Sequence, residues 1–401
     1  MRILLPYNHG VLPGTQTFYS HFHLGIEEAA RELGHEPVRF EHQDGMVISA
    51  AEREALYRLL AEKPCDLVLD LCCWSHALSQ VRAWDGSEAG EPIYDAFDCA
   101  YVGLLCDHPW FQPVQGMVSS NAWAAVPDQD HPDVIGLIYP QLTLRGTVFA
   151  PPAVRTAAIN AAQTEKSIDV LYAGTLDTTA LDRPWHNQPD ATLHDDMLAW
   201  AQAHPEASLH RALIETAHSN DITADPGRMQ SLLQKVEYCL RTRLRLDAVH
   251  AAAASGAALR VIGNGWSKVA LPPNVTVQAQ IDYEGLLALA AQARICVDAS
   301  TYRRGANDRV FNYTANGAVC FTNATGYLAE TFATDGDGGG LHSYSTLDLK
   351  ALGPAIRELL ESPARLREDA ERARATTLAK HTWRHRLETL IATTVRQIGQ
   401  N

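Results

Sequence analysis

The sequence predicts an α/β protein made of two domains, each organised around a parallel sheet. With 401 residues, the chain exceeds the size that one hydrophobic core usually serves, which predicts two domains. Short apolar runs alternate with amphipathic helical segments along most of the chain. This alternation is typical of parallel strands joined by crossover helices.

The first half alternates strands and helices from its first residues onward. Apolar side chains recur at helical spacing from residue 18 to Leu33, and Gly34 can end that helix. The proline-containing stretch 140–166 is interpreted as the connection between the domains. We expect a second helix at residues 50–62 and strands at residues 2–6, 37–40, 66–71, 102–106 and 134–139.

The second half repeats the alternation. Residues 184–226 surround a helical piece at 193–203, and we interpret them as a helical insertion because Leu, Ala and Trp recur in them. We expect strands at residues 168–172, 259–262, 275–278, 294–298 and 318–322, and helices at residues 232–254, 283–293, 346–360, 364–379 and 383–397.

The segment 294–322 carries the strongest functional signal. An apolar strand leads into a polar loop that contains Arg303, and Asn307 or Asp308 can cap the helix that follows. Gly317 can end this helix in a left-handed conformation, before the next strand begins. In such a strand–helix–strand unit, the helix N-terminus lies at the carboxyl ends of the strands. Open α/β sheets bind phosphorylated ligands at this edge.

Arg309 would lie in the first turn of that helix. Its guanidinium has the geometry and the permanent charge that suit a diphosphate. The alternative is that Arg309 forms a salt bridge with Asp308 or with a surface acid, and the spacing alone leaves both interpretations open.

Composition and charge narrow the possible partners and compartments. The formal net charge of −14 argues against a general affinity for nucleic acid or for an anionic membrane surface. The eight cysteines contain no Cys-x-x-Cys pair, so we expect buried thiols rather than a zinc or redox site. No signal peptide is evident, and no apolar run approaches ~18 residues. We therefore expect a cytoplasmic protein without a transmembrane segment, and peripheral contact with a membrane stays open.

Several motifs lie within residues 165–390: Arg309-Val-Phe-Asn312 with the following Ala315-Asn316-Gly317-Ala318, then Asp169–Thr175, Val236–Arg241, Val261–Trp266 and His381–Arg386. Together they resemble the motifs of CgeB-type spore-maturation glycosyltransferases, which have the GT-B fold of two facing Rossmann-like domains. The resemblance implies an N-terminal acceptor domain over residues 1–160 and a donor domain over residues 161–380, with a helix at 381–401 that packs back on the first domain.

The resemblance also implies an activity. It predicts transfer of a sugar from a nucleoside diphosphate sugar to a hydroxyl of a glycan, a lipid-linked saccharide or a protein. Such enzymes generally need no bound divalent ion, so we expect no metal and no other cofactor. We interpret Asp335 and Asp337, which precede three glycines, as part of a mobile loop. Alternatives are a nucleotide-sugar epimerase or hydrolase, or a non-catalytic subunit that binds the nucleotide-sugar.

Strand-end loops supply further donor-site candidates. Gly174 ends one strand, and Gly263 and Gly265 follow another with Lys268 nearby, although such glycines also occur in plain turns. Together with Arg303, Asn307 and Arg309, they complete the expected phosphate-binding set.

Asn312 belongs to the same expected donor site, but it departs from the family pattern. The family usually has a glutamate at this position, and in related enzymes that acid holds the ribose hydroxyls. If the pocket is otherwise of the family's type, Asn312→Glu would tighten donor binding.

We expect the catalytic base in the N-terminal half. His9 and the pair Asp107-His108 each follow a predicted strand, and Asp70 ends another, so all of them would lie at the carboxyl edge of a parallel sheet. A general base requires a His or a carboxylate within reach of the acceptor hydroxyl. The alternative for Asp107 is a structural role in capping the next turn.

Overall fold

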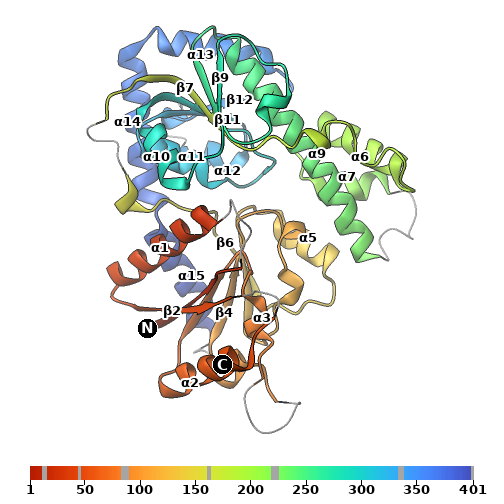
Figure 1. The fold of residues 1–401 in the computed structure, drawn as a ribbon, viewed down its shortest axis with the longest axis vertical. Helices are drawn as coiled ribbons and strands as arrows, with labels where there is room; N and C mark the ends of the chain where they lie inside the picture. Colours follow the sequence, from red (N-terminus) through yellow and green to blue (C-terminus); the bar gives the residue numbers. More distant parts are fainter. Residues whose placement is uncertain are drawn as a thin grey trace. The chain divides into compact units, whose positions relative to one another are not determined.

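The computed structural model describes residues 1–10, 16–43, 47–82, 90–159, 164–217, 225–332 and 338–398. It divides the chain into two compact units (Figure 1). Unit 1 combines Met1–Arg155 with Thr382–Asn401, and unit 2 comprises Thr156–His381. Each unit contains a six-stranded sheet whose strands all pair in parallel. The prediction of an α/β protein with parallel sheets is confirmed.

The sheet of unit 1 has the strand order β2-β1-β3-β4-β5-β6. Its central strands are buried along their whole length, as expected for a parallel sheet with both faces covered. The strands are β1 (Arg2–Asn8), β2 (Glu36–His42), β3 (Leu67–Leu71), β4 (Ala100–Leu104), β5 (Ala122–Val126) and β6 (Gly146–Phe149). The helices are α1 (Gln16–Glu32), α2 (Ala50–Glu62), α3 (His76–Ser79), α4 (Ile93–Ala96), α5 (His131–Ile138) and α15 (Trp383–Ile398).

The strand predicted at residues 134–139 is wrong, because this segment belongs to helix α5. The proline at position 132 lies in the first helical turn, where its missing N–H costs nothing. Val134, Ile135 and Ile138 then fall on one buried helical face. The actual strand β5 was missed because its sequence is rich in alanine, which is depleted in strands.

Helix α15, although last in the chain, packs on α1 within unit 1. The ring of Trp383 lies 5.3 Å from the ring of Phe22. A Cβ atom at Gly25 would lie only 2.3 Å from the Trp383 ring, so glycine is required where the two helices meet. Arg386 Nε donates a hydrogen bond of 2.6 Å to the carbonyl of Pro151.

The sheet of unit 2 has the strand order β12-β11-β10-β7-β8-β9. The strands are β7 (Ile168–Ala173), β8 (Leu259–Ile262), β9 (Val275–Gln278), β10 (Ala293–Val297), β11 (Val319–Asn323) and β12 (His342–Tyr344). The helices are α6 (Ala191–Ala203), α7 (Leu209–Thr216), α9 (Pro226–Ala253), α10 (Tyr283–Gln292), α11 (Asp308–Ala315), α12 (Gly326–Phe332), α13 (Leu352–Leu360) and α14 (Pro363–Lys380).

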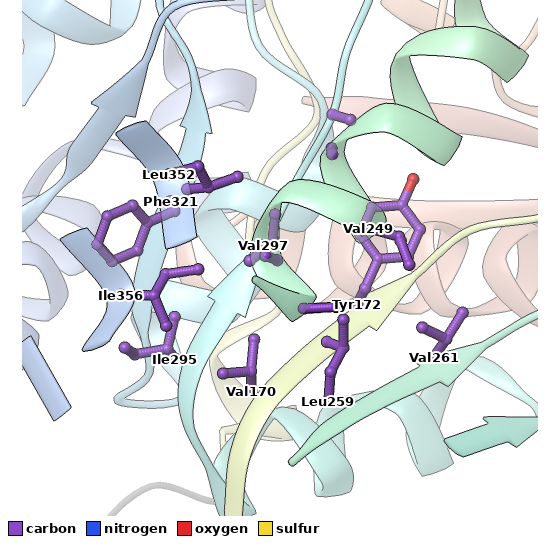
Figure 2. Close-up of a cluster of buried hydrophobic side chains, with 14 of the residues drawn as sticks. Val170, Tyr172, Val249, Leu259, Val261, Ile295, Val297, Phe321, Leu352 and Ile356 are labelled. Atoms are coloured by element: carbon purple, nitrogen blue, oxygen red, sulfur yellow. The ribbon is translucent and has the colours of Figure 1, made fainter. Parts of the chain in front are cut away.

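The core of unit 2 lies between this sheet and helices α9 and α13 (Figure 2). Val170 and Ile295 come from neighbouring strands, Val249 comes from α9, and Ile356 comes from α13. The N-terminal part of α9 carries α6 and α7, which lie in the expected insertion; residues 218–224 of that stretch are outside the described residues.

The cysteines are mostly buried thiols, as expected from the sequence. All eight cysteines are free thiols, and all but the partly buried Cys106 are buried. In the part of the chain that the structure describes, no helix combines the length and apolarity needed to cross a membrane.

Candidate functional site

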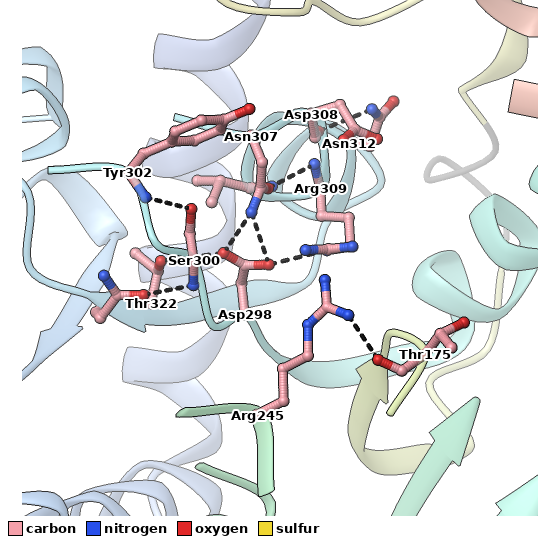
Figure 3. A network of polar contacts seen from close by, with 12 residues as sticks. Thr175, Arg245, Asp298, Ser300, Tyr302, Asn307, Asp308, Arg309, Asn312 and Thr322 are labelled. Atoms are coloured by element: carbon pink, nitrogen blue, oxygen red, sulfur yellow. Dashed lines mark hydrogen bonds and ion pairs between the residues drawn. The ribbon is translucent and has the colours of Figure 1, made fainter. Parts of the chain in front are cut away.

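The candidate site of unit 2 begins where β10 leads into α11. Asn307 is the N-cap of α11, because its Oδ1 accepts hydrogen bonds from the backbone N–H groups of Arg309 (3.0 Å) and Val310 (3.4 Å). Its Nδ2 donates to both carboxylate oxygens of Asp298, at 3.1 and 2.9 Å (Figure 3). Gly317, with φ of 74°, ends the helix as predicted. Asn307 therefore joins the strand end to the start of the helix.

Arg309 forms a buried ion pair with Asp298. Its Nε donates to Asp298 Oδ1 at 2.9 Å, and the side chains are 20% and 0% exposed. Burial alone would lower the pKa of Arg309, but the Asp298 carboxylate raises it above its ordinary value. The charge of Arg309 is thus already balanced, by Asp298 rather than by Asp308. Sequence reasoning did not select Asp298, although a polar residue directly after a buried strand is a usable signal.

Arg245 is a second site residue that sequence reasoning missed. It reaches the strand ends from helix α9, and its guanidinium points toward Arg309 (Figure 3). One Nη donates to the carbonyl of Thr175 at 2.5 Å, whereas Nε is buried without an acceptor. Burial lowers the pKa of Arg245 to about 10, and the charges of Arg309 and Arg241 act in the same direction. The spacing of Glu237, Arg241 and Arg245 places all three on one face of α9, which is the signal that could have identified it.

The predicted glycines lie where two strand-end turns approach each other closely. A Cβ atom at Gly263 (φ 141°) would lie 2.3 Å from the carbonyl oxygen of Gly174, and one at Gly265 (φ 88°) would lie 1.9 Å from that of Leu176. The Gly174 N–H donates to the carbonyl of Ile262 at 2.9 Å. The close approach of these turns therefore accounts for Gly263 and Gly265, and the Gly174 amide is already engaged.

The remaining basic candidates lie in different places. Lys268 is exposed at the end of a short 3-10 turn, Trp266–Lys268. Arg303 is partly buried in the loop between β10 and α11. This loop is anchored to α9, because Thr301 Oγ1 donates to Glu237 at 2.7 Å.

Asn312 lies in α11 with a fixed amide orientation. Its Nδ2 donates to the Tyr283 hydroxyl (3.0 Å) and to the Asp308 carbonyl (2.8 Å). Tyr283 in turn donates its hydroxyl proton to the Asp308 carboxylate. Asn312 is only 2% exposed, and its Oδ1 is buried without a hydrogen-bond donor.

The catalytic-base candidates of unit 1 follow different strands of the sheet. His9 follows β1, is partly exposed and contacts Glu41 at 3.3 Å. His108 follows β4, is buried, and its Nδ1 lies 3.0 Å from His131 Nε2. Because β3 lies between β1 and β4, about 10 Å separates the two strands. His9 and His108 are therefore independent candidates.

Asp107 has a local structural contact. Its Oδ1 accepts the N–H of the next residue, His108, at 2.8 Å. The His108 ring stacks on Trp110, with ring centres 4.4 Å apart. The contact of Asp107 fits its alternative, structural role in the turn. The stacking on Trp110 fixes the orientation of the His108 ring.

Asp70, which the sequence predicts at a strand end together with His9 and Asp107, is a buried carboxyl group near the end of β3. Asp70 accepts hydrogen bonds of 2.9 Å from the Ser75 N–H and from the Tyr101 hydroxyl. Burial raises the pKa of Asp70 to about 7. The turn that follows holds Cys72 and Cys73 at φ values of 60° and 55°, a conformation that is costly for residues with a side chain.

Asp335 and Asp337 lie outside the described residues. Over the described ranges, no group of three or more His, Cys, Asp or Glu side chains is arranged to hold a metal ion.

Comparison with known proteins places this geometry in context. Residues 224–392, which include α9 and α11, match the model of a family described as glycosyl transferase-like. No curated protein sequence matches the chain.

Solved structures resemble the chain over its whole length. AviGT4, a glycosyltransferase involved in avilamycin A biosynthesis, has a TM-score of 0.56 at 15% identity, covering 100% of this chain and 99% of that one. Sucrose-phosphate synthase from Thermosynechococcus elongatus has a TM-score of 0.52 at 12% identity, with 100% and 98% covered. An alpha-glucosyltransferase in complex with UDP-glucose and DNA has 0.52 at 14%, with 100% and 98% covered. The protein therefore has the two-domain GT-B fold, and its residues 224–392 are similar to the glycosyl transferase-like family.

Proposed function

We propose that the protein transfers a sugar from a nucleoside diphosphate sugar to a hydroxyl of a glycan, a lipid-linked saccharide or a protein. One observation carries the proposal: the basic, polar network around Asp298 lies at the carboxyl edge of a parallel sheet, within the residues that match the glycosyl transferase-like family. The CgeB-type motifs that contain Arg309 and Asn312 support the same assignment.

The donor class follows from the charge that the site can stabilise. In glycosyl transfer from such a donor, negative charge develops on the departing diphosphate, and fixed cations at that position lower the barrier. Arginines are well suited to phosphate oxygens because their N–H groups form a rigid fork. Arg303 and Lys268 remain candidates to assist at the same edge, and we propose that no bound divalent ion is required.

The acceptor side is assigned to unit 1. His108, held by His131 and stacked on Trp110, is our first candidate for the base that removes the acceptor's hydroxyl proton, and His9 is the second. The formal net charge of −14 argues against nucleic acid as the acceptor. We place the reaction in the cytoplasm because the cysteines are free thiols.

The test is turnover by the purified full chain. Nucleoside diphosphate sugars would be screened first by thermal shift, because a ligand at 100 times its dissociation constant adds about 2.7 kcal/mol of stability. Release of nucleoside diphosphate would then be measured with and without acceptor mixtures, and with a chelator present. We expect release that depends on the acceptor and survives chelation.

Other outcomes separate the alternatives. Binding without turnover across the acceptor mixtures would favour a non-catalytic subunit. Release without any acceptor would indicate a hydrolase, and an altered sugar on an intact nucleotide would indicate an epimerase. Absence of binding to every nucleotide and nucleotide-sugar would contradict the proposal.

A further inference from the structure

The charges around the site of unit 2 do not balance in pairs. Arg309 is paired with Asp298 at 2.9 Å, and Arg241 is paired with Glu237 at 2.5 Å. Arg245 lies close enough to both arginines for their charges to act on it. Among the described residues, no carboxylate lies within ion-pair distance of Arg245, and its hydrogen bond goes to a neutral carbonyl. One guanidinium is therefore left without a counter-charge.

A second unpartnered polar group lies beside this guanidinium. The Tyr172 hydroxyl is buried at the end of β7 and has no hydrogen-bond partner. A Cβ atom at Gly174 would lie 3.2 Å from this hydroxyl and 3.6 Å from Arg245 Nε. Both groups therefore border the place that a side chain at position 174 would fill. An unpartnered hydroxyl and a guanidinium without a counter-charge thus border the same place, and it is this combination that points to an anionic ligand.

We propose that Arg245 and Tyr172 bind the diphosphate of the donor, and that Arg309 is a positioning residue held in place by Asp298. The identity of the ligand as a nucleoside diphosphate rests on the function proposed above. The anion would supply the counter-charge that Arg245 lacks and would accept a hydrogen bond from the Tyr172 hydroxyl.

The chemistry of both groups suits this role. Burial raises the pKa of Tyr172 to about 12, so the hydroxyl keeps its proton at neutral pH and can donate it to a phosphate oxygen. Glycine at position 174 places no side chain between the two groups. Thr175, to which Arg245 is bonded, is exposed, so this strand end is accessible to solvent.

The proposal also predicts opposite effects of two arginine substitutions on stability. Removing Arg309 would leave the buried Asp298 carboxylate without its counter-charge, which destabilises the fold. Removing Arg245 would delete an uncompensated, partly buried cation, so the unliganded protein should be as stable or more stable. A purely structural Arg245 would behave like Arg309.

The experiment is calorimetric titration of the full chain with inorganic pyrophosphate and with UDP. Arg245→Met removes the charge, Tyr172→Phe removes the hydroxyl, and Gly174→Ala fills the place between them. Arg243→Met is the matched control because it makes the same change of charge on the same helix, two residues away. Thermal melting without ligand is recorded for these variants and for Arg309→Met.

We expect Arg245→Met to weaken pyrophosphate and UDP binding about 10- to 100-fold, as for loss of a charged hydrogen-bond donor. Tyr172→Phe should weaken it by about 10-fold or more, as for loss of a hydrogen bond to a charged group. Gly174→Ala should also weaken it, because the added methyl group would occupy the place between the two groups. Arg243→Met should change it less than about 3-fold. Arg309→Met alone should lower the melting temperature.

Two results would overturn the inference: unchanged pyrophosphate affinity in Arg245→Met, or a melting temperature that falls in Arg245→Met as much as in Arg309→Met. Failure of the proposed function is distinguishable. If pyrophosphate binds through Arg245 but no sugar is transferred, the proposed anion site is supported and the proposed transferase activity is contradicted. If sugar is transferred but Arg245→Met binds the anion as well as the unaltered protein does, the transferase activity is supported and the anion site is contradicted.

Discussion

At the scale of single residues, hydrogen-bond direction decides what position 312 can do. The Tyr283 hydroxyl uses its hydrogen in the bond to the Asp308 carboxylate, so toward Asn312 its oxygen can act only as an acceptor. The backbone carbonyl of Asp308 is likewise only an acceptor. The amide N–H₂ of Asn312 satisfies both acceptors, and a carboxylate, which has no hydrogen to donate, satisfies neither. Tyr283 and Asp308 therefore present acceptors that suit the amide of Asn312, where the CgeB-type pattern has a glutamate.

We accordingly expect Asn312→Glu to lower the free energy of unfolding and not to tighten donor binding. A carboxylate at this position would face two acceptors and lie close to the negative charge of Asp308, at a cost of about 1–3 kcal/mol. Urea unfolding and calorimetric titration with UDP would measure both effects, and Asn312→Gln is the neutral control of equal length. Tenfold tighter UDP binding by the glutamate variant would show that the pocket is of the family's type.

The ion pair between Arg309 and Asp298 gives a second prediction at this scale. Arg309→Met should lower the free energy of unfolding by about 3–5 kcal/mol, because it leaves a fully buried carboxylate unpaired. Adding Asp298→Asn should restore part of the loss, since an amide at 298 can be buried at lower cost. Urea denaturation of both variants checks this. Equal stability of Arg309→Met and the unaltered protein would show that the pair contributes nothing.

At the scale of elements, the β10–α11–β11 unit shows what local sequence can predict. Its strands and helix were predicted to within one or two residues because the Asn307 cap and the Gly317 stop are local signals. The identity of the capping residue still required the structure. The alanine-rich strand β5 and helix α5 were not predicted, since their apolar residues fit either pattern and burial in the sheet decided between them.

The site itself was predicted only in part, for a related reason. Arg309 and Asn307 could be selected because they belong to a helix start that is visible in the sequence. The partner of Arg309 is 11 positions away, and Arg245 contacts Thr175 across 70 positions. No local pattern shows which acid neutralises which base, so neither the pairing nor the unpaired guanidinium could be inferred.

Helix α1 should make the stability of unit 1 depend on pH through His23. This side chain is fully buried between the rings of Tyr7 (5.0 Å) and Tyr19 (4.5 Å), and neither ring nitrogen has a hydrogen-bond partner. Burial, assisted by the charge of Arg39, lowers the pKa of His23 from 6.5 to about 3. The unfolded chain therefore takes up a proton that the folded protein excludes, and stability is lost as the pH falls below about 6.5.

For His23 this loss amounts to about 1.5 kcal/mol between pH 6.5 and pH 5. Asp70 has the opposite sign, because its raised pKa makes stability fall as the pH rises toward about 7, so the comparison must be made between proteins that share Asp70. His23→Gln should remove the loss attributed to His23, and the exposed His250→Gln serves as control. Parallel pH profiles for His23→Gln and the unaltered protein, measured by urea denaturation, would contradict the assignment.

At the scale of the whole molecule, the fold rests on the sheets and on the likeness to solved structures, whereas the donor class rests on the site of unit 2. Each unit has its own parallel sheet, and likeness to solved structures at 12–15% identity establishes the GT-B fold. The family match supports glycosyl transfer and is confined to residues 224–392. The assignment of a donor class depends on the arginines at the strand ends of unit 2, and above all on the one without a counter-charge.

A structure of the full chain bound to a nucleoside diphosphate tests that assignment most directly. We expect phosphate oxygens within about 3.2 Å of the Arg245 guanidinium and of the Tyr172 hydroxyl, with Arg309 still paired to Asp298. A diphosphate bound in unit 1, or one held in unit 2 by Lys268 and Arg303 while Arg245 contacts only Thr175, would contradict it.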